Sequence, residues 1–117
     1  MKRPLLLLLL GMVLLSALAV AARDQKKDPP LRTVRGQVVD KDEKPLPSAI
    51  IYLKNLSNKS ETTHIADDEG NYRFSGLDPN VDYEIHAEHQ GKSSVKRTIS
   101  TFESRKEIIM QLKVDRK

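Results

Sequence analysis

The sequence predicts an all-β domain, built as a seven-stranded Greek-key β-sandwich. From residue 33 onward, apolar residues recur at every second position in short runs, which is the period of a strand with one buried face. Turn-forming residues separate these runs at intervals of roughly eight to twelve positions, as they do in sandwiches and barrels. This region has no apolar period of helical length. Strands that each bury one face must pack those faces together, and two packed sheets achieve this.

The first two predicted strands lie at residues 34–38 and 49–54. Their inward positions are Val34, Gly36, Val38, Ala49, Ile51 and Leu53. A glycine within a strand permits a bulge or the close approach of a neighbouring backbone, which gives Gly36 a structural role. Pro45 and Pro47 stiffen the loop between the two strands and cannot donate to a ladder, so Leu46 between them is placed to cover the open end of the sandwich.

The third, fourth and fifth predicted strands lie at residues 62–66, 72–74 and 83–89. Residues 67–71, with the sequence Asp-Asp-Glu-Gly-Asn, form the turn between the third and the fourth strand. Gly70 lies at the tip of this hairpin, where a positive φ is expected and a residue without a side chain fits.

A corner precedes the fifth strand, because Leu77 is followed by turn residues before the chain re-enters the core at Tyr83. The Tyr83 ring is expected to pack in the core while its hydroxyl bonds the loop backbone, as in the tyrosine corner of sandwich folds. The last two predicted strands lie at residues 95–99 and 108–114. The predicted buried set is Val34, Val38, Ile51, Leu53, Phe74, Tyr83, Ile85, Ile99, Ile108 and Leu112.

Residues 1–22 have the order of a secretory signal peptide. Lys2 and Arg3 precede a leucine-rich run that ends in small residues, so cleavage is expected after Ala21 or Ala22. The alternative is an uncleaved anchor, since the apolar run is just long enough to span a bilayer as a helix. We expect an exported protein of the periplasm, cell envelope or medium, which contacts a membrane only if this segment is retained.

The rest of the chain divides into a flexible charged linker at residues 23–32, the β-domain at residues 33–114 and a tail at residues 115–117. The linker contains two prolines and no apolar period. The chain has no cysteine, so packing and hydrogen bonding must stabilise the domain without disulfides. The 20 basic and 16 acidic residues alternate along the chain and aromatic residues are few, which argues against nucleic-acid binding.

Five segments taken together carry a resemblance to a known family. They are residues 34–40, 45–53, 67–74, 77–79 and 83–87, with Val-Arg-Gly-Gln-Val-Val-Asp as the first of them. In this order and spacing they resemble the carboxypeptidase regulatory-like domain, an immunoglobulin-like sandwich of the transthyretin-like or prealbumin-like group.

The resemblance implies an accessory domain that is not an enzyme. Such domains are fused to peptidases, outer-membrane receptors or surface proteins, where they assist folding, spacing or contacts. None of the matched positions is catalytic in the family, so we predict no catalytic residue and no cofactor. No peptidase or receptor segment accompanies the domain in this sequence. The expected partner is therefore a separate, unidentified envelope or extracellular protein.

The residues that are able to bind metal or perform catalysis do not form a convincing site. His86 and His89 point to opposite faces of a predicted strand, whereas zinc needs converging ligands, for which His64 is the one further histidine. The acidic turn lacks the ligand spacing of a calcium-binding loop. Relatives of the transthyretin group include a hydroxyisourate hydrolase with a terminal Tyr-Arg-Gly-Ser, and that motif is missing from residues 112–117. We predict no metal site.

Carbohydrate binding is the alternative function, because starch-binding domains share the sandwich shape and sugars often bind exposed aromatic rings. The alternation places Tyr52 on the outward face of its strand and Phe102 in the loop before the last strand, which makes them the candidate ligand contacts. Asn55 and Asn58 begin glycosylation sequons, which we interpret as turn residues of a bacterial protein. A row of exposed rings would favour a sugar ligand, whereas an uncovered apolar edge strand would favour a protein partner.

Overall fold

The computed structural model describes residues 30–117, which form nine strands and contain no helix. Within these residues no helix is long and apolar enough to cross a membrane. The predicted signal peptide and residues 23–29 of the predicted linker lie outside the described residues. The nine strands are β1 (Arg32–Val39), β2 (Ile50–Asn55), β3 (Glu61–Ile65), β4 (Asn71–Leu77), β5 (Tyr83–His89), β6 (Lys92–Ser94), β7 (Arg97–Ile99), β8 (Glu107–Ile109) and β9 (Leu112–Arg116).

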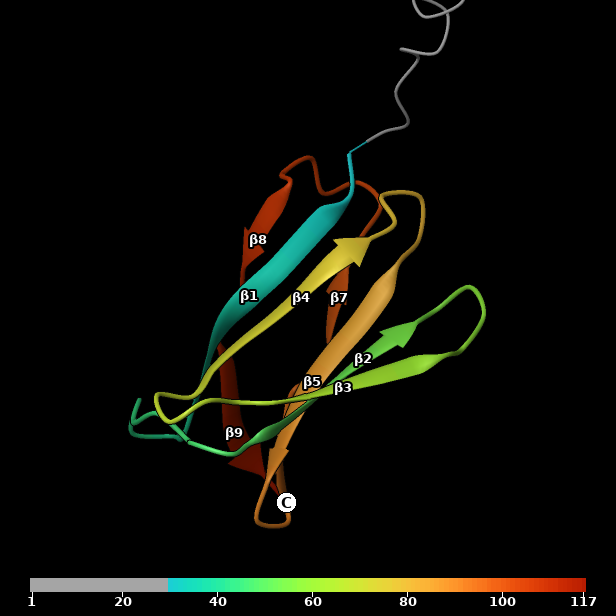
Figure 1. The fold of residues 1–117 in the computed structure, drawn as a ribbon. Coiled ribbons are helices and arrows are strands. Elements are labelled where there is room, and N and C mark those ends of the chain that lie inside the picture. Colours follow the sequence, from blue (N-terminus) through green and yellow to red (C-terminus); the bar gives the residue numbers. More distant parts are fainter. Residues whose placement is uncertain (1–29) are drawn as a thin grey trace, which may run out of the picture.

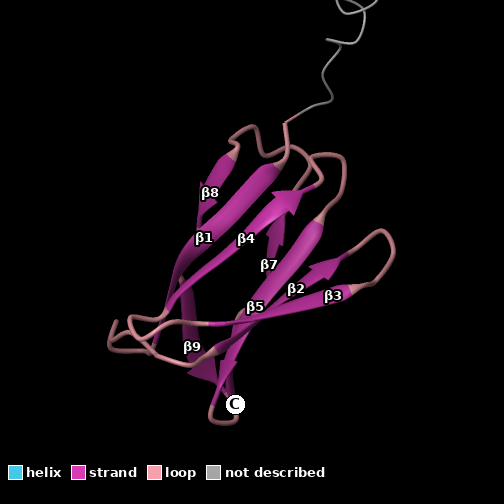
Figure 2. Cartoon of the chain, in the orientation of Figure 1, coloured by secondary structure: helices cyan, strands magenta, loops and turns pink. Residues whose placement is uncertain are grey.

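The strands form one mixed sheet that curls into a nearly closed, barrel-like shape (Figure 1). Along the hydrogen-bonded path the order is β3-β2-β5-β6-β9-β1-β4, while β7 pairs with β5 and β8 pairs with β1. The pairs β1–β8 and β1–β9 are parallel, and the other pairs are antiparallel. Figure 2 shows strands and loops alone in the described part. The all-β prediction is confirmed.

The structure has two strands more than the seven predicted, because β6 was not predicted and the last predicted strand is divided. The predicted strand at residues 95–99 is shortened to β7, and β6 is an additional strand just before it, with Ser94 buried and Val95 47% exposed between the two strands. The Ser94 hydroxyl accepts a hydrogen bond from the Ala87 amide at 2.8 Å, which fixes this irregular point in the ladder.

The predicted strand at residues 108–114 is divided at Met110, between β8 and β9. The carbonyl oxygen of Met110 accepts a hydrogen bond of 2.5 Å from the buried Tyr72 hydroxyl. A Cβ at Gly36 would lie 1.9 Å from the same oxygen, so only glycine leaves room for this carbonyl. The ladder with β1 is interrupted where that carbonyl points into the interior.

The core lies between the two sides of the curled sheet. All ten residues of the predicted buried set are buried, with Val34, Val38, Ile51 and Ile85 fully inaccessible. They pack in one cluster together with residues that the prediction did not include. These are Ala49, Ala66, Tyr72, Leu77, Ala87, Met110 and Val114.

The first strand begins two residues earlier than the sequence predicts. Arg32, which the charged composition assigned to the linker, is 3% exposed and lies in β1. Its Nη1 donates to the carbonyls of Ser100 and Glu103 at 2.8 and 3.2 Å, and its Nη2 to those of Asp78 and Val81, both at 3.4 Å. The guanidinium thus fastens two loops to the start of the sheet. At the other end, β9 continues to Arg116, within the predicted tail.

Candidate functional site

The two sides of the sheet meet differently at its two lateral junctions. At one junction β6 pairs with β9 and joins the two sides through hydrogen bonds. At the other junction β3 and β4 are the ends of the hydrogen-bonded path, and within residues 30–117 the structure pairs neither with a further strand on its open side. The strands meet at the turn of residues 66–70 and diverge toward Glu61 and Leu77 (Figure 1). We call this opening the β3–β4 seam.

The β3 strand is exposed along its whole length. Its register pairs Thr62 with Leu53 and His64 with Ile51, and both partners face the core. Thr62 and His64 therefore occupy the inward positions of β3, where the other strands place apolar residues. Both remain exposed, because β3 and β4 diverge from their common turn and do not pair.

The register also shows where the backbone groups of β3 point. The Asn55 amide donates to the Ser60 carbonyl and the Ala66 amide to the Ala49 carbonyl, both at 2.8 Å. Hydrogen-bonded pairs alternate with non-bonded pairs in an antiparallel ladder. The amides and carbonyls of Glu61, Thr63 and Ile65 consequently face the seam. On the β4 side, the Val38 amide donates to the Gly70 carbonyl at 2.8 Å, so Val38 and Gly70 form a hydrogen-bonded pair of the β1–β4 ladder. By the same alternation, Arg73 belongs to a non-bonded pair, and its amide and carbonyl also face the seam.

A cleft of about 240 Å³ lies in the wide part of the seam. Its floor consists of the edges of four core side chains, Leu53, Phe74, Leu77 and Tyr83, and its walls are polar. The wall residues are Asn55, Ser60, Thr62, Ser75 and Gly76.

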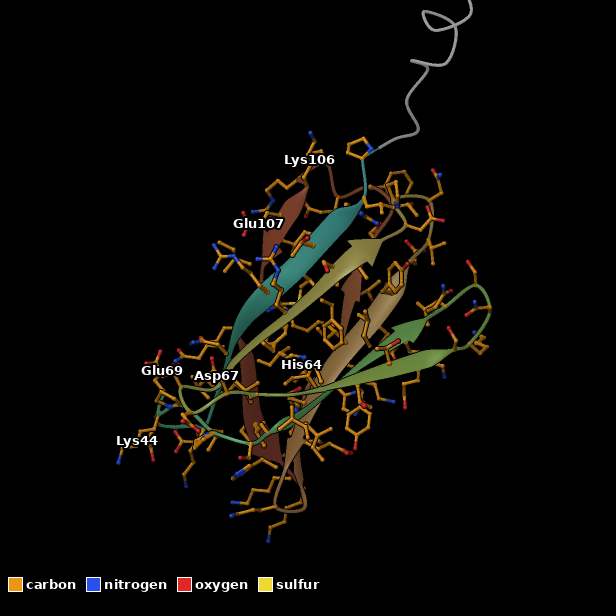
Figure 3. All side chains as sticks on the ribbon, viewed as in Figure 1. Lys44, His64, Asp67, Glu69, Lys106 and Glu107 are labelled. Atoms are coloured by element: carbon orange, nitrogen blue, oxygen red, sulfur yellow. The ribbon has the colours of Figure 1, made fainter. Side chains whose placement is uncertain are left out.

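A second hollow, of about 300 Å³, lies at the narrow part of the seam and includes His64 and Asp67 among its lining residues. The His64 ring meets the Phe74 ring edge-on, with 5.8 Å between the ring centroids. Figure 3 labels His64 on β3 and Asp67 at the turn where the two strands meet. The backbone amides of Asn71 and Glu69 donate to the Asp67 carboxylate and lower its pKa. The turn is thereby held closed, while the wide part of the seam stays open.

The β4 wall of the seam has an excess of positive charge. Arg35 on β1 and Arg73 on β4 are direct cross-strand partners on the outer face. Glu107 on β8 forms an ion pair with Arg35, and this hydrogen-bonded contact lowers the pKa of the Glu107 carboxyl. Within residues 30–117 no carboxylate forms an ion pair with Arg73. One guanidinium beside the seam is therefore available to an acidic group.

The first predicted ligand contact, Tyr52, is half-buried on the outer face of β2. The His86 ring stacks on it with the centroids 4.9 Å apart and an interplanar angle of 11°. The neighbouring Glu88 carboxylate raises the pKa of the Tyr52 hydroxyl. One face of the Tyr52 ring is thus covered by a neighbouring side chain.

The second predicted contact, Phe102, is 94% exposed in the loop between β7 and β8. The loop is fixed by the Phe102 amide, which donates to the Ser100 hydroxyl at 3.1 Å, and by the Thr101 amide, which donates to the Asp82 carboxylate at 2.7 Å. In the described part of the chain, the structure records no contact between the Phe102 ring and another aromatic ring. The structure does not bring Tyr52 and Phe102 together.

The predicted structural residues at the other end of the domain have identifiable contacts. Gly70 has a φ of +77°, and a Cβ there would lie 2.7 Å from the Val38 carbonyl oxygen. Pro45 forms an isolated bridge with Val39, and Leu46, which packs against the core, donates its amide to the Val38 carbonyl. Pro47 lies exposed in the same loop. The loop and the turn cover one end of the barrel.

The predicted corner residues lie beside the seam. Tyr83 is 7% exposed, and its hydroxyl accepts a hydrogen bond of 2.9 Å from the Asp78 amide. Leu77, at the end of β4, is 5% exposed. The corner connects β4 to β5, and its two side chains, Leu77 and Tyr83, form part of the floor of the cleft.

For metal binding, the structure has no group of three or more histidine, cysteine or acidic side chains that converge within residues 30–117. His64 lies on the inward side of β3 and His86 on the outer face of β5, so the barrel wall separates them.

A family model for the carboxypeptidase regulatory-like domain matches residues 33–113. The chain belongs to this family. The match covers most of the chain and coincides with the strands of the described part, so the resemblance expected from the sequence is confirmed. A comparison of this chain with curated protein sequences found no match.

Solved structures with a similar fold have very different sequences. Catechol 1,2-dioxygenase from Acinetobacter sp. ADP1 is 12% identical with a TM-score of 0.57, and the match covers 79% of this chain and 54% of the enzyme. BcpA, the major pilin subunit of Bacillus cereus, is 16% identical with a TM-score of 0.56, covering 76% of this chain and 31% of the pilin. The regulatory-like domain thus spans about half of the first protein and a third of the second. At such low identities the likeness shows the fold alone.

A third similar structure is the dioxygenase domain of a dioxygenase carbohydrate-binding protein fusion from Streptomyces sp. SirexAA-E. It is 11% identical with a TM-score of 0.54, and the match covers 80% of this chain and 84% of that domain. Enzymes and a pilin therefore share this arrangement of strands, and the arrangement by itself selects no activity.

Two features of the regulatory-like domain were not part of the prediction from the sequence. It did not single out His64 as a seam residue, although a polar residue at an inward position of a predicted strand is a signal that this face is uncovered. It did not place Arg32 in the core, and no local pattern indicates that role, since the four carbonyls it binds are distant in sequence.

Proposed function

We propose that this regulatory-like domain is an exported, non-catalytic module that acts by contact with another protein in the cell envelope or outside the cell. The observation that carries the proposal is the uncovered edge strand β3, with Ile65 at 65% exposure, beside an apolar-floored cleft. Family membership supports it, because regulatory-like domains are accessory modules. The order of charged, apolar and small residues in residues 1–22 supports export.

The likeness to the pilin subunit is compatible with a structural or contact role, since a pilin is itself an assembly subunit. The carbohydrate alternative has less support, because a sugar platform needs free ring faces. Tyr52 shares one face with His86, and Phe102 lies in a separate loop. We therefore favour a protein partner.

Export is tested by the mass and location of the chain produced in its source cells. Release with the periplasmic or extracellular fraction, at the mass expected for cleavage after Ala21 or Ala22, supports the proposal. A chain found in the cytoplasm at full length contradicts it. A chain of full length in the membrane fraction indicates the anchored form, in which the domain still lies outside the cytoplasm.

Protein contact is tested by photo-crosslinking in the same cells, with a photoreactive residue at Ile65 or, as the control, at the exposed Ile109 on β8. We expect a discrete crosslinked protein from the Ile65 position and none from the control position. Absence of any crosslink over a series of surface positions contradicts the proposal. Retention on a polysaccharide, lost in Tyr52→Ala or Phe102→Ala, would replace it with the carbohydrate function.

A further inference from the structure

We propose that the β3–β4 seam binds an extended segment of a partner protein, which pairs with the free edge of β3 and places apolar side chains over Phe74. This inference rests on the proposed function and specifies its site and its ligand. The occupant is a single strand of alternating apolar and polar residues that contains an acidic side chain near Arg73.

The backbone of β3 determines that the occupant is a strand. Glu61, Thr63 and Ile65 direct their amides and carbonyls into the seam, as the alternation with the hydrogen-bonded pairs at Ser60 and Ala66 requires. Another extended chain satisfies all of these groups at the spacing of a ladder, which is how peptides add to exposed sheet edges. Without such a chain the edge is open to water along its full length.

The shape of the seam excludes a second folded copy of the domain as the occupant. The seam is bounded on its other side by β4 and narrows to the turn at residues 66–70 (Figure 1). The cleft in its wide part measures about 240 Å³, which admits a few side chains of one strand and no second sheet. Residues 23–29 do not fit either, because apart from Pro29 all of their side chains are charged or polar and the floor is apolar.

The floor determines the inward side chains of the occupant. Leu53, Phe74, Leu77 and Tyr83 are between 5% and 7% exposed, so only their edges reach the cleft. The residue of β3 that lies next to Leu53 is Thr62, which is polar and does not cover the apolar edges of the floor. An apolar side chain from the occupant removes these edges from water.

The positive charge of Arg73 determines that one outward side chain of the occupant is acidic. Arg73 lies on the outer face of β4 beside the seam, next to Arg35, whose charge Glu107 already neutralises. An aspartate or glutamate on the outward face of the inserted strand compensates the remaining guanidinium and relieves the repulsion between the two arginines. The seam therefore discriminates between acidic and basic segments.

The test uses the protein at its native length and a synthetic hexapeptide with valine at positions one, three and five, aspartate at position four, and threonine at positions two and six. Binding is followed by NMR titration and by amide hydrogen exchange. We expect a dissociation constant below about 1 mM and slower exchange at Glu61, Thr63, Ile65 and Arg73. Replacing the peptide aspartate by asparagine weakens binding to the wild type and has no effect in Arg73→Gln.

The decisive variants are at Thr63, whose amide faces the seam and takes no part in the β2–β3 ladder. Thr63→Pro removes this donor at an edge position that tolerates proline, and Thr63→Val retains the donor as the matched control. We expect Thr63→Pro to weaken binding by at least about tenfold and Thr63→Val by less than about twofold. Unchanged exchange of the core amides in β1 and β5 verifies that both variants are folded.

Three outcomes of the binding measurements overturn the inference. They are no binding at about 5 mM peptide, equal weakening in the two Thr63 variants, and equal binding of a peptide N-methylated at every second residue. A dimer that forms through β3 and is not displaced by the peptide also overturns it. These results leave the crosslinking test of the contact function unaffected, because a partner that crosslinks at another surface position supports contact without the seam.

Discussion

The closed and the open junction of this barrel differ in the residues at their inward positions. At the closed junction, β9 places Leu112 and Val114 inward, at 1% and 4% exposure. At the open junction, β3 places Thr62 and His64 inward, and both stay exposed. Burial of two apolar side chains stabilises the pairing of the closed edge, whereas threonine and histidine gain little from being covered. The sheet closes where its edge strand is apolar on the inner face.

The largest expected effect comes from weakening the closed junction. Leu112→Ala leaves a cavity under β9 and is expected to lower the free energy of unfolding by about 2–5 kcal/mol. Ile65→Ala, on the exposed face of β3, is expected to change it by less than about 0.5 kcal/mol. Urea denaturation of both variants measures the difference. Similar losses in the two variants would show that the junctions do not differ as described.

A smaller effect is expected at the floor of the open junction. Tyr83→Phe keeps the ring in the core and removes the hydrogen bond that its hydroxyl accepts from the Asp78 amide. The amide of Asp78 loses its partner in this part-buried bond, so we expect a destabilisation of about 1 kcal/mol. Thermal unfolding measures it, with Tyr52→Phe on the outer face as the control. An unchanged melting temperature would show that the corner does not depend on this bond.

These two predictions also separate what the sequence determines from what it leaves open. Alternation identified Leu112, Tyr83 and eight further core residues, because each strand buries the same face along its whole length. Alternation within a single strand does not reveal which strands become neighbours. The opening beside Thr62 and His64 is a property of two strands that lie apart, and it emerges only from the three-dimensional arrangement.

The interruption of the last predicted strand shows the same limit. The break at Met110 depends on Gly36 and on the Tyr72 hydroxyl, which come from two other strands. The site predictions were limited for a related reason. Tyr52 has the exposed position expected from its strand, but its stacking on His86 depends on the pairing of β2 with β5.

A still smaller effect is expected for an inward residue of the open junction. His64→Val makes this position of β3 apolar without covering it, and we expect the free energy of unfolding to change by less than about 0.5 kcal/mol. Chemical denaturation tests this, with His89→Val as the control at a half-buried position of β5. A large stabilisation would indicate that β3 and β4 close once the histidine is removed.

The smallest effect is expected from the exposed ion pair between β9 and the loop that follows β1. The Lys113 ammonium on β9 lies 2.8 Å from the Glu43 carboxylate and lowers the pKa of Glu43 below its ordinary value of 4.5. Because the folded-state pKa is the lower one, the stabilisation is present above about pH 4.5 and is lost as the pH falls through the folded-state value.

Glu43→Gln should therefore reduce stability slightly at neutral pH and remove this part of the acid dependence. The measurement is thermal unfolding from pH 7 to pH 2, with the exposed Glu61→Gln on β3 as the control. If the melting temperatures of the wild type and of Glu43→Gln fell in parallel below pH 4.5, the ion pair between Glu43 and Lys113 would not contribute to stability.

The parallel pairing of β1 with β8 and β9 has a mechanical consequence. The chain enters β1 at one end of the barrel and leaves β9 at the opposite end (Figure 1). A force that pulls the chain before β1 away from the chain after β9 slides these strands along each other, so their hydrogen bonds resist together and do not open one at a time. Arg32 adds four carbonyl contacts at the point where the tension enters. The domain is thereby suited to transmit tension without unravelling.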